Sequence, residues 1–202
     1  RDYPSQIQTL VDRRTEVLLA MTHSVGERGG RRTTAQQRRI ERKRLLWRPE
    51  RGALTSSIRL LVHELPRFAG SHRITIDTDE HPLYASVIER DRAMRWYRSA
   101  GRLSVRVTPG SAPRTVVNPL FAVNYVDRMI RHRMKEHTRE SIAVGRNATM
   151  QMHRMWMFAW DHNVRQPKRV ARWSRCRAVE AGASERLVGR LEREFTTRRR
   201  AI

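Results

Sequence analysis

The spacing of hydrophobic residues along the chain alternates between a two-residue repeat and a helical repeat. Over residues 73–79, Ile74 and Ile76 alternate with polar residues, which is typical of a strand. Over residues 55–65, apolar side chains recur every three or four positions, as on the buried face of a helix. The same reasoning predicts strands at 5–12, 16–25, 73–79 and 103–108, and helices at 36–46, 55–65, 84–96, 119–134 and 148–162.

The order of these elements indicates an α/β protein, because strands and helices are interleaved rather than grouped apart. Prolines mark two helix boundaries: we expect Pro66 and Gly70 to close one helix and Pro119 to be the first residue of another. After Pro167 the chain becomes basic and holds few core residues. The sequence therefore predicts a core at residues 1–166 and a basic helical tail at 167–202.

The chain carries a formal net charge of +22, from 42 lysines and arginines against 20 acidic residues. Only three of the basic residues are lysines, and arginine offers a planar group that bonds phosphate at two points. Residues 27–51 hold ten basic and three acidic residues, and residues 165–202 hold twelve and four. Such segments favour nucleic acid as a partner. The alternative is a solvated basic surface that follows from an arginine-rich composition alone.

Composition excludes several other classes of protein. A single cysteine, Cys176, leaves no disulfide framework and no zinc site built from cysteines. No apolar run approaches the roughly 20 residues that span a bilayer, and the first residues do not resemble a signal peptide. Since the first residue is Arg1 rather than Met, we expect a processed chain or a fragment of a longer one.

Acidic residues are scarce in so basic a chain, and two groups of them indicate chemistry. Asp77 and Asp79 end a predicted strand, where α/β sheets present their active sites, and alternation puts both on one face. Asp127 shares a polar helix stripe with Asn124 and Arg131. Carboxylates of this kind hold Mg²⁺, and a pair of such metals serves phosphodiester chemistry. The alternative for Asp127 is an ordinary helical ion pair with Arg131.

Three stretches of the chain resemble one family of proteins. ITIDTDEHPLY, residues 74–84, resembles the segment that carries the second acid in bacterial insertion-sequence transposases of the DDE class. NPLFAVNYVDRMIRHRMKEHTRESIAVGRN, residues 118–147, resembles the third-acid region of the same proteins. Residues 5–25 are similar to the strand pair that follows their first acid, and the likeness covers about residues 3–165, some four-fifths of the chain.

The resemblance implies a ribonuclease-H-like fold, a mixed sheet flanked by helices, whose acids hold Mg²⁺ or Mn²⁺. Asp79 matches the second acid and Asp127 the third, which is commonly Glu in the class, and Glu140 is the fallback for the third. The strand with the first acid precedes the hairpin in these proteins, so we expect a core that is incomplete at its N-terminus, with the first strand missing. Asp12 lies in the predicted hairpin turn, and we expect it to cap that turn.

The implied activity is metal-dependent cleavage of insertion-element ends and transfer of the cut strands to target DNA. The resemblance also implies a homo-oligomer on DNA, at the nucleoid in the bacterial cytoplasm, with no membrane partner. Absence of the first acid is a reason for such a fragment to be inactive. The candidate DNA-binding residues are His81, Arg131, Arg133, Arg139 and Arg146.

Two alternatives stay open at this point. An arginine-rich, non-enzymatic RNA-binding protein of the ribosomal type accounts for the charge without any metal site. Trp47, Trp96 and Trp173 lie among arginines, where they either stack on bases or pack against arginine side chains.

Overall fold

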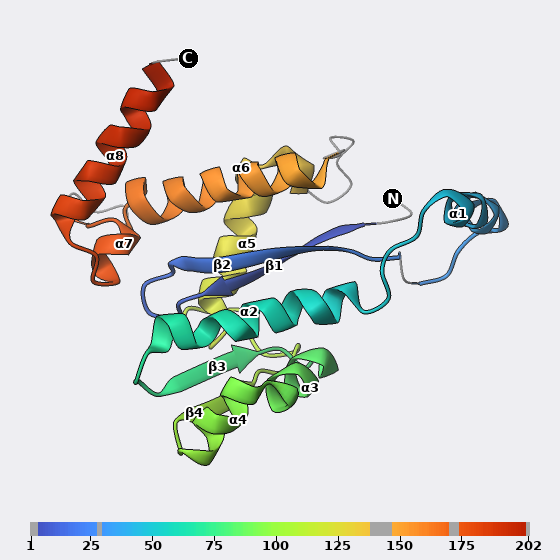
Figure 1. Ribbon diagram of the computed structural model, residues 1–202, viewed down its shortest axis with the longest axis horizontal. Helices are drawn as coiled ribbons and strands as arrows, with labels where there is room; N and C mark the ends of the chain where they lie inside the picture. Colours follow the sequence, from blue (N-terminus) through green and yellow to red (C-terminus); the bar gives the residue numbers. More distant parts are fainter. Residues whose placement is uncertain (1–3, 28–29, 138–146, 170–173, 201–202) are drawn as a thin grey trace. The chain divides into compact units, whose positions relative to one another are not determined.

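The computed structural model describes residues 4–27, 30–137, 147–169 and 174–200. These residues form a mixed α/β fold (Figure 1), which confirms the predicted class at this level. Contacts group the chain into two units: unit 1 comprises residues 1–9 and 20–110, and unit 2 comprises residues 10–19 and 111–202. Both units therefore include part of the N-terminal hairpin.

The hairpin consists of β1 (Ser5–Val11) and β2 (Leu18–Val25), as the apolar pattern predicts. In its turn, Glu16 N donates to Asp12 O at 2.9 Å. The Asp12 carboxylate accepts the backbone N–H of Thr15 at 2.8 Å, which confirms Asp12 as the residue that caps the turn. Glu16 has a φ of 63°, a left-handed conformation that residues other than glycine seldom adopt.

Two helices of unit 1 follow the hairpin. α1 (Thr34–Leu46) begins with a capping box, in which Thr33 and the glutamine three residues later each accept the other's backbone N–H. α2 (Ala53–Ala69) continues through Pro66 and ends just before Gly70, so the expected end is confirmed at Gly70 and wrong at Pro66. A proline removes one backbone donor and restricts the preceding residue, but the helix closes only where the N–H of Gly70 bonds to Pro66 O.

The second sheet of unit 1 pairs β3 (Ile74–Thr78) with β4 (Leu103–Val107) in parallel. A parallel pair needs a long crossover connection, which α3 (Pro82–Arg90) and α4 (Arg92–Ser99) supply. The sequence predicts one helix here, and the structure has two. Asp91 causes the break, because its carboxylate accepts a backbone N–H at 2.9 Å in the first turn of α4 and so caps a new helix.

The core of unit 1 is built from α2, β3 and the two crossover helices, which lie together in Figure 1. Burial of the apolar stripe predicted for residues 55–65 is confirmed by Ile58, Leu61 and Val62, each at most 8% exposed. This core fixes the ends of β3 and β4 relative to the helices around them. Its fully buried members are Ile58, Val62, Ile74, Val87, Ile88, Met94 and Tyr97.

Unit 2 is mainly helical. α5 begins at Phe121 rather than at the expected Pro119, because the Asn118 side chain accepts the N–H of Leu120 at 2.8 Å and holds these residues in a turn. α5 buries Val126, as its helical spacing predicts. The described elements are α5 (Phe121–Arg133), a 3₁₀ turn η1 (Lys135–His137), α6 (Ala148–Trp160), a π-helical turn η2 (Asp161–Arg165), α7 (Arg177–Glu180) and α8 (Glu185–Arg200).

Candidate functional site

Asp79 follows directly after β3, at the carboxyl end of the parallel strand pair. The strand contact continues to this end, since Thr108 N donates to Thr78 O at 2.8 Å. The Asp79 side chain is exposed, and its Oδ1 accepts the N–H of His81 at 3.0 Å. Because α/β sheets place ligand sites at the carboxyl ends of their strands, Asp79 is held where chemistry is expected.

Two neighbours of Asp79 are bonded to the chain around it. Glu80 Oε2 accepts the N–H of Gly110 at 2.8 Å, which joins the turn after β3 to the loop after β4. His81 Nδ1 accepts the N–H of Leu83 at 3.3 Å and so caps α3. With Nδ1 accepting, the neutral ring of His81 presents Nε2 as a donor, the group that a phosphate oxygen accepts.

Asp77 has a different role from Asp79. β3 ends at Thr78, so the alternation that the sequence suggested for both carboxylates stops before Asp79. Asp77 lies opposite Arg106 of β4, whose Nε and Nη2 donate to the two carboxylate oxygens at 2.7 and 2.9 Å. This contact raises the pKa of Arg106 through the hydrogen bond and the opposite charge. Asp77 therefore stabilises the sheet.

Asp127 lies on α5, next to the buried Val126. Its side chain is 42% exposed, and Arg131 Nη2 lies 4.0 Å from Oδ2, so the ion pair considered from the sequence is present. Partial loss of water raises the pKa of Asp127, and the charge of Arg131 opposes this rise. The direction of the pKa therefore reflects the loss of water around the Asp127 carboxylate, and the pairing with Arg131 offsets part of it.

The predicted DNA-binding arginines differ in their surroundings. Arg133 Nη1 donates to Asp161 Oδ2 at 3.0 Å, so part of its charge is neutralised within unit 2. Arg131 is exposed beside Asp127. Arg139, Arg146 and the fallback acid Glu140 lie outside the described residues.

The two candidate metal ligands belong to different units, Asp79 to unit 1 and Asp127 to unit 2. Among the described residues, no three Asp, Glu, His or Cys side chains form a group that could hold a metal ion. Comparison with protein-family models, curated proteins and solved structures finds no match. The fit to a metal therefore rests on donor chemistry: Mg²⁺ takes one or two carboxylates and completes its shell with water and phosphate.

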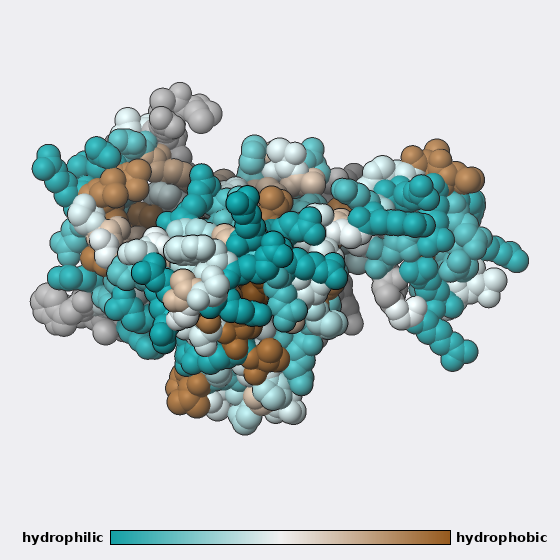
Figure 2. Space-filling model, turned by 60° about the horizontal axis from the view of Figure 1, so that its bottom comes forward, coloured by the Kyte–Doolittle hydropathy of each residue, from teal (hydrophilic) through white to brown (hydrophobic). Residues whose placement is uncertain are grey.

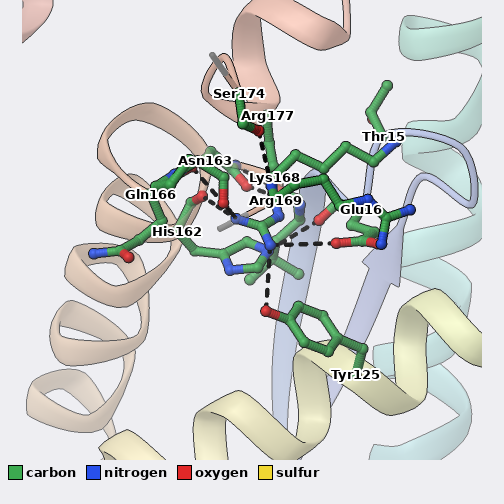
Figure 3. A network of polar contacts seen from close by, with 12 residues as sticks. Thr15, Glu16, Tyr125, His162, Asn163, Gln166, Lys168, Arg169, Ser174 and Arg177 are labelled. Atoms are coloured by element: carbon green, nitrogen blue, oxygen red, sulfur yellow. Dashed lines mark hydrogen bonds and ion pairs between the residues drawn. The ribbon is translucent and has the colours of Figure 1, made fainter. Parts of the chain in front are cut away.

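A buried polar network in unit 2 was not found by sequence reasoning (Figure 3). Arg177, only 2% exposed, lies at its centre. Its Nη2 lies 3.2 Å from Glu16 Oε2 and donates to the Tyr125 hydroxyl at 3.4 Å. Its Nη1 lies 3.2–3.4 Å from the carbonyl oxygens of His162, Gln166 and Pro167.

His162 belongs to the same network and is also 2% exposed. Its Nε2 lies 2.9 Å from the carbonyl oxygen of Glu16 and must carry the proton, since a carbonyl only accepts. Burial lowers the pKa of His162 to about 4, and the positive charges of Arg177 and Arg133 act in the same direction. The ring is therefore neutral at pH 7 and serves the fold, because a side chain so deeply buried does not reach a substrate.

The first arginine-rich segment borders a hollow of about 620 Å³ in unit 1. Arg44 donates twice to Glu27, at 3.0 and 2.7 Å, and these bonds lower the pKa of Glu27. Arg48 and Arg51 line the same hollow, and within the described part of the chain neither is paired with a carboxylate. Part of the positive charge of this segment is therefore not balanced by a carboxylate in the described residues.

The surface in Figure 2 is mostly hydrophilic, with hydrophobic patches between the polar side chains. One patch lies on α1, at the right of the view, where Leu45 and Leu46 are 86% and 90% exposed. No helix in the described ranges is long and apolar enough to cross a membrane. These leucines are too few to make a large apolar surface.

Proposed function

We propose that this chain is a DDE-type DNA transposase, or part of one, which cleaves phosphodiester bonds at insertion-element ends and transfers the strands. The observation that carries the proposal is the position of Asp79. It is an exposed aspartate held at the carboxyl end of the β3–β4 pair, inside the segment 74–84 that resembles the second-acid motif. Asp127 supports it, because the resembling third acid also follows the start of a helix.

The element order supports a ribonuclease-H-like core for this function. A hairpin, two helices and a parallel strand pair with a helical crossover follow one another along the chain. In the described residues the hairpin and the parallel pair are two separate two-stranded sheets, whereas the proposed core joins them in one mixed sheet. A strand that precedes the hairpin carries the first acid and supplies hydrogen-bond partners for strand edges.

Asp79 and Asp127 would hold Mg²⁺ or Mn²⁺ together with the first acid. When bound, the metal polarises the phosphate and lowers the pKa of an attacking water. The remaining tasks belong to side chains described above. The backbone N–H of His81 orients the Asp79 carboxylate, the His81 ring offers its Nε2 proton to a phosphate oxygen, and Arg131 stands beside Asp127 as a positive charge for the DNA backbone.

The arginine-rich segments 27–51 and 165–202 would hold the DNA, since each neutralised phosphate releases counterions. In this function the protein acts as a homo-oligomer on element ends and target DNA, at the nucleoid in the bacterial cytoplasm.

Mn²⁺ binding to the full chain, measured by calorimetry, tests the proposed site. Asp79→Asn and Asp127→Asn should each weaken the affinity at least about 10-fold, because loss of a ligand matters more than loss of a supporting residue. Asp77→Asn is the matched control: it removes a carboxylate from the same strand, but one already bonded to Arg106. Its Mn²⁺ affinity should equal that of the wild type.

The same purified proteins distinguish a transposase from an RNA-binding protein. Mg²⁺-dependent nicking of element-end DNA, lost in the Asp79→Asn variant, would support the transposase. Unchanged Mn²⁺ affinity in the Asp79→Asn, Asp127→Asn double variant would reject the site. Tight, salt-sensitive RNA binding without any response to Mn²⁺ would instead favour the ribosomal type of RNA-binding protein.

A further inference from the structure

The solvent side of α4 combines an exposed tryptophan with arginines. Trp96 is 55% exposed, and the guanidinium carbon of Arg102 lies 5.9 Å from the centre of its ring. Arg92 is exposed four residues before Trp96, on the same side of the helix, and the exposed Arg95 and Arg98 lie on its flank. From residue 92 to residue 102 the chain has no acidic residue. This surface, called the α4 platform below, consists of Arg92, Arg95, Trp96, Arg98 and Arg102.

The positive charge of the α4 platform is not neutralised by its neighbours. Within the described residues, none of its four arginines is paired with a carboxylate. Other arginines of unit 1 are paired with a carboxylate. Arg67 lies 2.7 Å from Glu64, and Arg106 lies 2.7 Å from Asp77. An aromatic ring with Arg102 against it and Arg92 one helical turn away fits a partner that offers both negative charge and a flat apolar face.

The platform is held in place from below. The inner side of α4 buries Met94 and Tyr97 in the core of unit 1, at 0% and 4% exposure. The Tyr97 hydroxyl donates to Gly70 O at 2.6 Å, and its ring meets Trp96 edge-on with centres 5.0 Å apart. A side chain that is already ordered loses little entropy on binding, which favours a stacking role.

The platform is separate from the proposed metal site. α4 leads directly into β4, and Ile74 N donates to Arg102 O at 2.8 Å, so Arg102 lies at the amino ends of the two parallel strands. Asp79 follows the carboxyl end of β3. The length of the strands therefore separates Arg102, which contacts the Trp96 ring, from Asp79 within unit 1.

We propose that the α4 platform binds single-stranded DNA, with Trp96 stacked on an unpaired base and the surrounding arginines on phosphates. An unpaired strand is required because base faces are covered by stacking inside a duplex. The inference rests on the proposed function only for the choice of DNA as the strand. Retention of a displaced single strand during cleavage is the use that such a surface would have.

Fluorescence anisotropy with a labelled dT oligonucleotide of about 15 nucleotides, in EDTA, tests this binding. Trp96→Ala should weaken the affinity about 5- to 150-fold, the range expected for one stacked base, and Trp96→Phe should restore most of it. The affinity for a duplex of equal length should fall less than about 2-fold in Trp96→Ala, since a duplex offers no free base face. Arg92→Ala, which removes the arginine on the same side of the helix as Trp96, should reduce the slope of log K against log salt by about 0.7.

Arg67→Ala is the matched control, because it removes one exposed charge from the same unit but one already paired with Glu64. Its salt slope should stay that of the wild type. Circular dichroism and a thermal melt establish that each variant is folded. The proposal is overturned if Trp96→Ala binds dT as the wild type does, if strand and duplex lose equal affinity, or if an rU oligonucleotide binds more tightly than dT.

This experiment is independent of the metal test. EDTA removes divalent cations, so a loss of dT binding in Trp96→Ala stands even if Mn²⁺ does not bind at Asp79. Conversely, Mn²⁺ binding lost in Asp79→Asn supports the proposed function even if Trp96→Ala binds dT normally.

Discussion

Loss of the Arg177 side chain should be the most damaging single change in unit 2. Its guanidinium is 2% exposed and lies 3.2 Å from the Glu16 carboxylate, whose side chain is 8% exposed. In the Arg177→Met variant the Glu16 charge stays buried without an opposite charge. The three backbone carbonyl oxygens that face Nη1 lose their donor as well.

The magnitude follows from the burial of both partners. Removal of one member of a buried ion pair destabilises a protein by about 3–5 kcal/mol. Each kcal/mol lowers the melting temperature of a chain of this size by about 2–4 °C, so Arg177→Met should lower it by about 6–20 °C. Such a loss is a large share of the roughly 5–15 kcal/mol that holds a domain folded.

Urea unfolding of four proteins measures the effect: the wild type, Arg177→Met, Glu16→Gln and the double variant. The double variant should lose at least about 1 kcal/mol less than the sum of the single losses, because it leaves no unpaired buried charge. Arg175→Ala is the control in the same unit. Its side chain is 66% exposed and lies 3.3 Å from Glu185, which is 69% exposed, and its loss should cost less than about 1 kcal/mol.

Two results would refute this reasoning. One is an Arg177→Met variant that unfolds within about 1 kcal/mol of the wild type, the size of a surface ion pair. The other is strict additivity of the two single variants, which would show that Arg177 and Glu16 act separately.

Three further predictions concern pH, the sheet and a helix start. His162 has a folded pKa of about 4 against an ordinary 6.5, so the unfolded chain binds the proton first; stability in urea should fall by up to about 3 kcal/mol between pH 6.5 and 4, and less in His162→Gln. Asp77→Asn should weaken the β3–β4 pair by about 0.2–1 kcal/mol in urea. Asp91→Ala removes the cap of α4 and should cost about 1 kcal/mol in a thermal melt, whereas Asp91→Ser should cost less.

Local patterns were enough to predict most elements, because apolar spacing depends on residues a few positions apart. β1, β4 and α6 lie where alternation or helical spacing placed them. The predicted helix boundaries were wrong where a single polar side chain determines the start of a helix. Asp91 divides an expected helix because it caps a new one, and Asn118 delays the start of α5 because it holds a turn. Such residues occur often outside these roles, so their identity alone does not reveal them.

Long-range contacts were beyond the reach of sequence patterns. Glu16 and Arg177 are 161 positions apart, and composition placed Arg177 in a basic tail. Similarly, the partner of Asp77 depends on the register of β3 against β4, which alternation does not define. Asp79 was predicted as a candidate from its place after a strand, and its exposure and turn bond agree with that place. Its role as a metal ligand stays a prediction.

The net charge of +22 therefore overstates the positive charge that the surface offers to a partner, because some arginines are paired or buried. The charge of Arg177 is balanced by Glu16 inside unit 2, and the charge of Arg106 is balanced by Asp77 on the neighbouring strand. The arginines of the α4 platform, and Arg48 and Arg51 at the hollow, have no carboxylate partner among the described residues and face solvent or phosphate. Because the salt dependence of binding counts the phosphates neutralised, it should reflect these uncompensated arginines and not the formal charge. A slope that matched the full charge would contradict this reasoning, because it would require even the buried Arg177 to neutralise a phosphate.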